Sequence, residues 1–157
     1  MQPLDQGLNA AILFITSRLI PNGYLAADDA PSTFEALVSQ FDAGNMMVVY
    51  SGRSDHTIYG DAAVNHAFRA WHDWCHWKGT FPLSPDGEAE ACQMQCDQLY
   101  DLYGLNAHTL RWASIIKAEV IGQAIYFERH GRFPGNQRLF IQHYLANPEI
   151  AFINPAL

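Results

Sequence analysis

The sequence predicts a mainly α-helical fold, a bundle of about five to six helices with at most a short strand near residues 46–50. Apolar residues recur at spacings of three and four over most of the chain, which is the period of an amphipathic helix. Capping residues and Gly or Pro stops divide this pattern into segments of helical length. The connections between the longer segments are short, and short connections make neighbouring helices antiparallel.

Residues 1–60 are expected to form an N-terminal packing segment. An apolar face runs along residues 4–19 until a Pro-Asn-Gly turn stops the first helix. Ser32 and Glu35 form a capping-box pattern that begins a short second helix. Residues 46–50 are either a brief strand or an extended loop, because no second strand is evident to pair with them.

Residues 61–146 are expected to form the core of the bundle. Start signals are Asp61 as an N-cap, Ser84-Pro85 as a cap followed by proline, and Pro134 as the opening of a shorter helix. The helices predicted in this core are 61–77, 84–103, 109–130 and 134–145. The tail beyond them carries Phe152 and Ile153, which we expect to dock on the body of the protein.

Length, composition and charge bound the class of protein. The chain has 157 residues, of which 49% are hydrophobic and 16% charged, as expected for one domain over residues 1–157. A net charge of -7 without a basic cluster argues against a nucleic-acid surface. The longest apolar run, residues 10–15, is too short for a membrane span. Three cysteines and a start without a signal-peptide pattern favour a reducing, cytoplasmic setting.

Two stripes of polar residues lie beside the most apolar faces of two predicted helices. In each stripe the residues follow offsets of 0, 4, 7 and 11, so all four share one helix face. The stripes are Asn65, Arg69, His72 and His76 on one helix, and Glu119, Gln123, Tyr126 and His130 on the other. Burying such residues is costly unless they pair with one another or bind a ligand.

Hairpin register brings the two stripes to one level. If the first loop centres near residue 81, antiparallel partners sum to about 162, and His76 lies opposite residues 86–88. If the next loop centres between residues 106 and 107, Glu88 lies opposite residues 125–126. His72, Glu88 and Glu119 then fall within about two helical turns, roughly 11 Å.

The five residues from His72 to His76 read His-Asp-x-x-His, which resembles the two-histidine clamp of helical zinc enzymes with Asp in place of Glu. Two imidazoles one turn apart can reach the same cation, and a third ligand can come from another helix. We therefore expect a divalent metal held by His72, His76 and either Glu119 or Glu88. Zinc fits this ligand set best, with iron or manganese as alternatives.

A metal at this position predicts a hydrolase in which a metal-bound water attacks a phosphoester or amide bond of a small-molecule or peptide substrate. Asp73 or the non-ligating glutamate would serve as the base, and Arg69, Gln123 and Tyr126 would stabilise negative charge. Because Asp is one methylene shorter than Glu, Asp73 would sit farther from the water than the base of a zinc protease does. This departure argues against a protease.

Each of these residues also has a structural explanation. The two histidines could be half buried and bonded to Glu88 or Glu119, and Arg69 could form a buried ion pair with Glu119. Tyr126 could be a core residue with a tethered hydroxyl. In that case the protein would be a non-enzymatic, acidic helical module that binds a host protein.

Two other metal sites are conceivable. Cys92 and Cys96, one turn apart, could complete a structural zinc site with the histidine pair, although the register argues against it. The adjacent His72 and Asp73 resemble the ligands of helical phosphohydrolases, for which His56 would be the upstream ligand. A di-iron carboxylate bundle needs Glu-x-x-His pairs, and the sequence contains none.

Several motifs resemble those of small uncharacterised proteins encoded by tailed bacteriophages. The motifs are Phe68–His76, Gly87-Glu88, Ala118–Gln123 and His130–Gln137, so the similarity covers roughly residues 60–145. The resemblance implies a phage accessory protein, which would act in the cytoplasm of a bacterial host. It implies no particular reaction.

Overall fold

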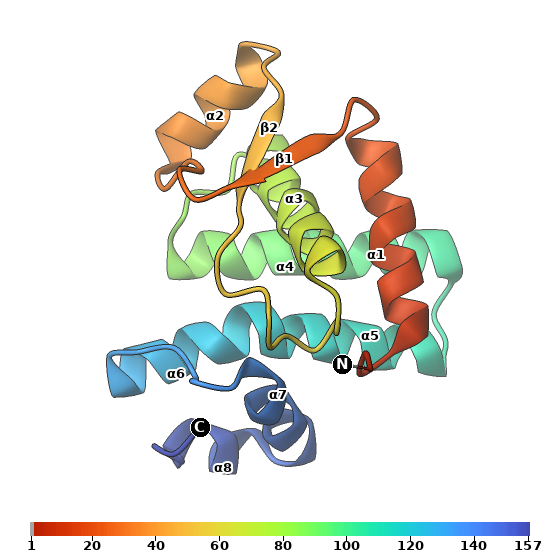
Figure 1. Ribbon diagram of the computed structural model, residues 1–157. Coiled ribbons are helices and arrows are strands. Elements are labelled where there is room, and N and C mark those ends of the chain that lie inside the picture. Colours follow the sequence, from red (N-terminus) through yellow and green to blue (C-terminus); the bar gives the residue numbers. More distant parts are fainter. Residues whose placement is uncertain (1) are drawn as a thin grey trace.

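The computed structural model describes residues 2–157 and confirms a mainly helical fold (Figure 1). The elements in chain order are α1 (Gln6–Leu19), β1 (Tyr24–Ala27), α2 (Phe34–Asp42), β2 (Met47–Tyr50), α3 (Ala62–Gly79), α4 (Pro85–Tyr103), α5 (Ala107–Lys117), the π-helical segment η1 (Ala118–Gly122), α6 (Gln123–His130), α7 (Gln137–Ala146) and α8 (Pro148–Ile153).

The short strand β2 has a partner that the sequence pattern did not reveal. β1 pairs with β2 in parallel, with Tyr24 opposite Met47 and Ala27 opposite Tyr50, and α2 forms the crossover between them. The middle of β1 is exposed, so its four residues show no alternation of buried and exposed positions. The predicted cap of α2 was one residue early, because the side chain of Thr33 accepts the bond from the backbone N–H of Ala36.

Helix α3 lies at the centre of the molecule, with α1 packed on one side and α4 on another (Figure 1). Asp61 caps it as predicted, accepting a bond from the backbone N–H of Ala63. Trp71 is completely buried, and its indole N–H donates to the side chain of Gln98 on α4 at 2.6 Å. The largest buried side chains around α3 and α4 are Leu8, Ile12, Ile58, Tyr59, Trp71, Leu99, Ile115 and Ile116.

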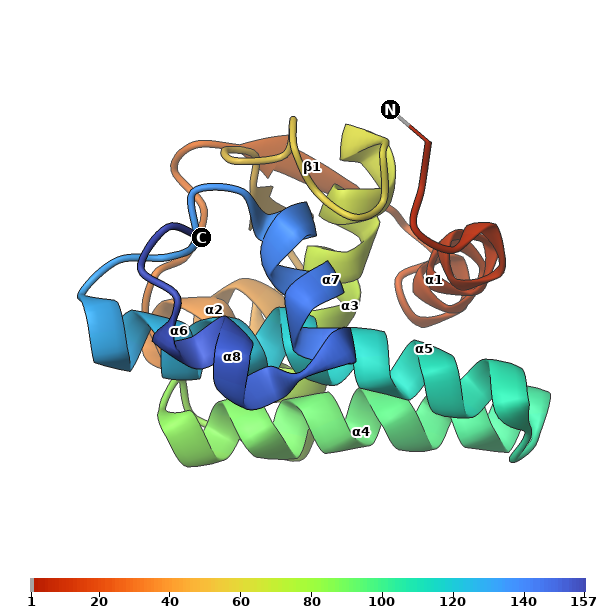
Figure 2. The same ribbon diagram turned by 90° about the horizontal axis from the view of Figure 1, so that it is seen from below.

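Helix α4 runs alongside the continuous rod formed by α5, η1 and α6 (Figure 2). Ser84 caps α4 and Pro85 stands in its first turn, as the sequence predicted. The single helix expected over residues 109–130 is wrong in one respect, because η1 interrupts its α-helical hydrogen bonding. A π-helical turn holds one more residue than an α-helical turn, which changes the faces on which the later residues lie.

The C-terminal part differs from the prediction at two points. Helix α7 begins at Gln137 and not at Pro134, because Asn136 is the residue whose side chain caps it. The tail forms an additional helix, α8, which packs against α6 and α7. Phe152 docks in the interior as expected, whereas 65% of Ile153 remains exposed.

No helix within residues 2–157 combines the length and apolar character that crossing a membrane requires.

The start of α4 depends on a close approach that only glycine allows. A Cβ added at Gly87 would lie 1.8 Å from the backbone oxygen of Pro82. We therefore expect Gly87→Ala to lower the free energy of unfolding by about 1–3 kcal/mol, because the backbone must move to relieve the overlap. Urea denaturation measures the change. Glu90→Ala, at an exposed position of the same helix, is the control and should change stability by less than about 0.5 kcal/mol.

Candidate metal centre

Three side chains from two helices each place one potential metal-ligand atom close to the other two. His72 Nε2 lies 2.8 Å from Glu88 Oε2, His76 Nε2 lies 3.4 Å from the same oxygen, and the two Nε2 atoms are 3.0 Å apart. The histidines stand one turn apart on α3, and Glu88 stands in the first turn of α4. His76 is completely buried, whereas His72 and Glu88 retain 14% and 31% of their side-chain exposure.

The local sequence explains why these residues meet. Thr80 ends α3 in a left-handed conformation, and the chain returns through a short loop to the cap at Ser84. Glu88 is four residues after this cap and its backbone N–H donates to the carbonyl of Ser84 at 2.8 Å. The tight loop therefore sets the last turn of α3 against the first turn of α4.

The other ring nitrogen of each histidine is held by an oxygen. His76 Nδ1 lies 2.9 Å from the carbonyl oxygen of Phe81, and His72 Nδ1 lies 2.9 Å from Oε1 of the buried Gln95. A carbonyl oxygen only accepts hydrogen bonds, so these contacts place the proton of each neutral ring on Nδ1. This pattern is typical of metal-ligating histidines, whose second nitrogen donates to a carbonyl or carboxylate.

With both rings neutral, two unprotonated Nε2 atoms would therefore face a carboxylate oxygen. Three lone pairs at these separations repel one another unless a cation or a proton lies between them. Burial lowers the pKa of His72, but the hydrogen bond and charge of Glu88 outweigh burial and leave that pKa raised. Burial would raise the pKa of Glu88, yet the bonds with His72 and His76 hold it well below its ordinary value. The site is therefore built to keep Glu88 ionised.

The separations of the three ligand atoms are close to those around a tetrahedral cation, and two of them are also hydrogen-bond lengths. With metal–ligand distances of about 2.0–2.1 Å, two ligands of a tetrahedral zinc lie roughly 3.3 Å apart. The three ligand atoms here are separated by 2.8, 3.0 and 3.4 Å. Two histidines and one glutamate with one position left over are the ligand set of a catalytic zinc site.

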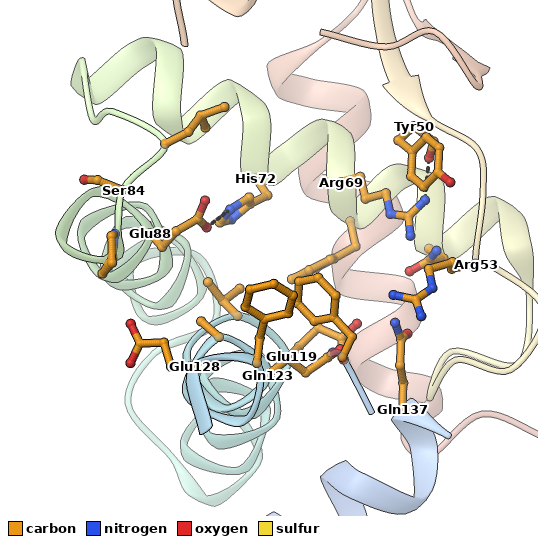
Figure 3. A pocket seen from close by; sticks show the side chains of 18 residues that line it. Tyr50, Arg53, Arg69, His72, Ser84, Glu88, Glu119, Gln123, Glu128 and Gln137 are labelled. Atoms are coloured by element: carbon orange, nitrogen blue, oxygen red, sulfur yellow. Dashed lines mark hydrogen bonds and ion pairs between the residues drawn. The ribbon is translucent and has the colours of Figure 1, made fainter. Parts of the chain in front are cut away.

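Two of these three residues, His72 and Glu88, line a cleft of about 810 Å³ (Figure 3). His72 and Glu88 lie at one end of this cleft, and Arg69 and Arg53 lie at the other end, beside Tyr50. The walls are largely apolar, and their apolar side chains are Phe68, Leu83, Pro85, Val120, Ala124, Phe127 and Phe133. A metal at the triad would therefore be accessible to a substrate of moderate size.

Glu119 lines the same cleft but does not belong to the cluster formed by His72, His76 and Glu88. Its Oε2 atom is buried without a hydrogen-bond partner among residues 2–157. Burial raises the pKa of Glu119 to about 7, against the opposing effects of the Arg69 charge and the Gln123 amide. Of the two glutamates considered as ligands, only Glu88 lies with the histidines.

The members of the second polar stripe do not all lie at the cleft. Glu119 and Gln123 line the cleft, but Tyr126 is completely buried elsewhere and donates to the carbonyl of Asn154 at 3.2 Å. His130 likewise bonds to the carbonyl of Phe152 at 2.8 Å. The offsets used for the prediction assume α-helical turns throughout, and the π-helical segment between Glu119 and Gln123 departs from that geometry. Within α6, Tyr126 lies on the face that packs in the interior and not on the face that lines the cleft.

Arg69 lies on the predicted face of α3 but has different partners from those expected. Its Nη1 donates to the carbonyl oxygens of Tyr50 and Gly52, and its guanidinium stacks on the Tyr50 ring at 5.3 Å. No ion pair within 4.0 Å joins Arg69 to Glu119 in the described part of the chain. The interpretation as a buried ion pair is therefore wrong, since the hydrogen bonds of Arg69 go from Nη1 to backbone carbonyls and not to Glu119.

Asp73 follows His72 on α3 but is not among the residues that line the cleft. Burial raises its pKa to about 6, with the two histidines acting in the opposite direction. Asp73 therefore influences the site through its charge and does not line the cleft.

The alternative metal sites are not assembled. Cys92 and Cys96 are completely buried, and neither belongs to a group of potential ligands among residues 2–157. His56 lines a separate pocket with Asp55 and Gly135, away from His72.

Sequence reasoning missed several residues that shape the site. Gln95 had a usable signal, because it stands seven residues after Glu88 and so shares its face of α4. No comparable pattern in the sequence marks Arg53 and Phe133, because they lie in loops that only the fold brings to the cleft.

Comparisons with known proteins add no identification, since no protein family, curated protein or solved structure matches the chain.

Glu119→Gln tests the burial of this carboxyl. Between about pH 4.5 and 7 the folded protein holds a proton on Glu119 that the unfolded chain releases, so wild-type stability falls as the pH rises through this range. A glutamine stays neutral. We expect the variant to exceed wild type by about 1–3 kcal/mol at pH 8 and to match it near pH 4.5.

Urea denaturation at both pH values gives the comparison. Glu128→Gln, which alters an exposed carboxylate of α6, is the matched control and should show no such pH-dependent gain. An equal gain in both variants would mean that Glu119 is solvated.

Proposed function

We propose that this protein is a metal-dependent hydrolase. In this proposal His72, His76 and Glu88 hold a divalent cation, with zinc as the best fit and iron or manganese as alternatives. The substrate, a small molecule or a peptide, enters the adjoining cleft and is cleaved at a phosphoester or amide bond.

The observation that carries the proposal is that three potential ligand atoms lie close together. The histidine rings that provide two of them are already held in this orientation by hydrogen bonds from their Nδ1 atoms. Phe81 and Gln95 orient the two imidazoles so that both Nε2 atoms point at the Glu88 carboxylate. The side of the cluster formed by His72 and Glu88 opens to the cleft, as a catalytic site requires and a closed structural site does not.

A bound cation would lower the pKa of a water and so supply hydroxide at neutral pH. Hydrolysis adds that hydroxide to phosphorus or to the carbonyl carbon, and a proton to the leaving oxygen or nitrogen. Glu119 lines the cleft without being a proposed ligand and is a better candidate for moving this proton than Asp73, which does not line the cleft. Gln123 and the free N–H groups of Arg69 could stabilise negative charge, whereas Tyr126 is too far removed.

A specific contact favours a second candidate function. His72 and Glu88, 2.8 Å apart, can form a charged pair with a proton and no metal. The cluster would then only join α3 to α4, and the chain would be an acidic helical module that binds a host protein.

The resemblance of residues 60–145 to tailed-bacteriophage proteins supports a further proposal about origin, namely a phage accessory protein in the cytoplasm of a bacterial host. The three cysteines are free and buried, as expected for a reducing compartment.

Metal content separates the two functions. We expect the protein purified without chelator to carry about one zinc, iron or manganese per chain by elemental analysis, or to take up one zinc on titration. Less than about 0.2 metal per chain, unrestored by added zinc or manganese, would contradict the proposal.

His76→Gln and Glu88→Gln should each lower zinc affinity by at least tenfold, because each removes one of three protein ligands. His108→Gln changes an exposed histidine of α5 and should leave the affinity unchanged.

Activity tests the assignment of the base. On bis(p-nitrophenyl) phosphate, or on a peptide p-nitroanilide, we expect Glu119→Gln to lower kcat by about 100-fold or more while zinc content stays at wild type. Glu90→Gln, at an exposed position of α4, is the control. A comparable loss in Asp73→Asn with full activity in Glu119→Gln would transfer the role to Asp73.

A further inference from the structure

Arg53 adopts a backbone conformation that arginine rarely takes. Its φ is +56°, in the left-handed region where glycine is favoured. Within residues 2–157 Thr80 is the other non-glycine residue with a positive φ, and it ends helix α3. Arg53 ends no helix, so helix termination does not account for its conformation.

The loop that carries Arg53 is fixed to α3 by hydrogen bonds. Ser54 Oγ donates to the carbonyl of Ser51 at 2.8 Å and accepts from Asn65 Nδ2 at 2.9 Å. Arg69 Nη1 donates to the carbonyl of Gly52 at 2.7 Å. These bonds to Asn65 and Arg69 hold Arg53 in place.

The side chain of Arg53 faces the cleft. Its guanidinium stacks on the Phe133 ring at 5.6 Å, and Gln137 lies beside it (Figure 3). In the described part of the chain, no side chain or carbonyl accepts a hydrogen bond or ion pair from it. Arg53 is exposed and also lines a neighbouring pocket with Asp55 and His56, so its five N–H donors are solvated and open to a ligand. A guanidinium binds carboxylate and phosphate oxygens bidentately.

We propose that Arg53 forms an oxyanion subsite at the end of the cleft opposite the metal centre, so that the substrate carries a phosphate or carboxylate group. This inference rests on the proposed hydrolase and specifies its substrate class. The subsite binds the oxyanion directly, with the ring of Phe133 supporting the guanidinium.

Hydrogen bonds place the Arg53 loop along α3. Arg69 precedes His72 by three residues and Asn65 precedes it by seven, which are rises of about 4.5 and 10.5 Å along α3. Because the Arg53 loop is bonded to both Arg69 and Asn65 through its neighbours, it lies beside the part of α3 that precedes the histidine pair.

The test measures binding of phenyl phosphate and of benzoate to the full chain by NMR titration, before and after EDTA is added. We expect shifts at Gly52, Arg53 and the Gln137 side-chain amide that persist in EDTA. Arg53→Gln should weaken binding at least fivefold. The tighter of the two probes identifies phosphate or carboxylate as the natural group.

Arg18→Gln is a matched control, because Arg18 is exposed on α1 and stacks on Phe14 at the same 5.6 Å distance. It should bind both probes as wild type does. Arg53→Gly should lose binding without any fall in Tm, because glycine adopts the left-handed conformation without cost. A fall in Tm with unchanged binding would show that Arg53 only supports the fold, and would overturn the proposal.

The outcomes separate this inference from the proposed function. Binding of a probe that depends on Arg53, in a chain that takes up no zinc, supports the subsite and rejects the hydrolase. Zinc uptake and ester hydrolysis, with probe binding unchanged in Arg53→Gln, support the hydrolase and reject the subsite.

Discussion

The arrangement of the site depends on one electrostatic constraint, the close approach of two imidazole nitrogens to a single carboxylate oxygen. Phe81 and Gln95 take the Nδ1 protons, so the Nε2 lone pairs of His72 and His76 point at Glu88. Such a cluster is stable only with positive charge at its centre, supplied by a metal ion or by a proton. The tight turn between α3 and α4 maintains the cluster, since it sets the facing turns of the two helices in register.

The cleft beside this cluster has two chemically different ends. The end at His72 and Glu88 can hold a cation, and the end at Arg53 and Arg69 can receive an anion. A substrate that covers the apolar walls between them would displace water and so strengthen the electrostatic interactions at both ends. Glu119 lies in this environment with a buried oxygen, which explains why its pKa is raised toward neutrality. A hydrolase acting on an anionic substrate would use both ends of the cleft.

The prediction of the fold succeeded where local signals were strong and failed where they were weak. Asp61 and Ser84 cap the helices that they were predicted to cap, because an N-cap bond is made within three residues. β1 was missed because its four residues carry no alternation, and its stability comes from pairing with β2 across a crossover. The π segment was missed as well, since hydrogen bonding to the fifth residue leaves no clear pattern in the sequence.

For the site, the sequence by itself determined that His72 and His76 share one helix face and that a hairpin brings Glu88 to their level. Helix periodicity and a short loop suffice for that conclusion, because both are local. Only the tertiary structure decided between Glu88 and Glu119, removed Tyr126 from the cleft and brought Arg53 into it. These outcomes depend on which face of each helix packs in the interior and on a distant loop packed against α3. Such relations arise from packing between segments far apart in the chain, which local periodicity does not encode.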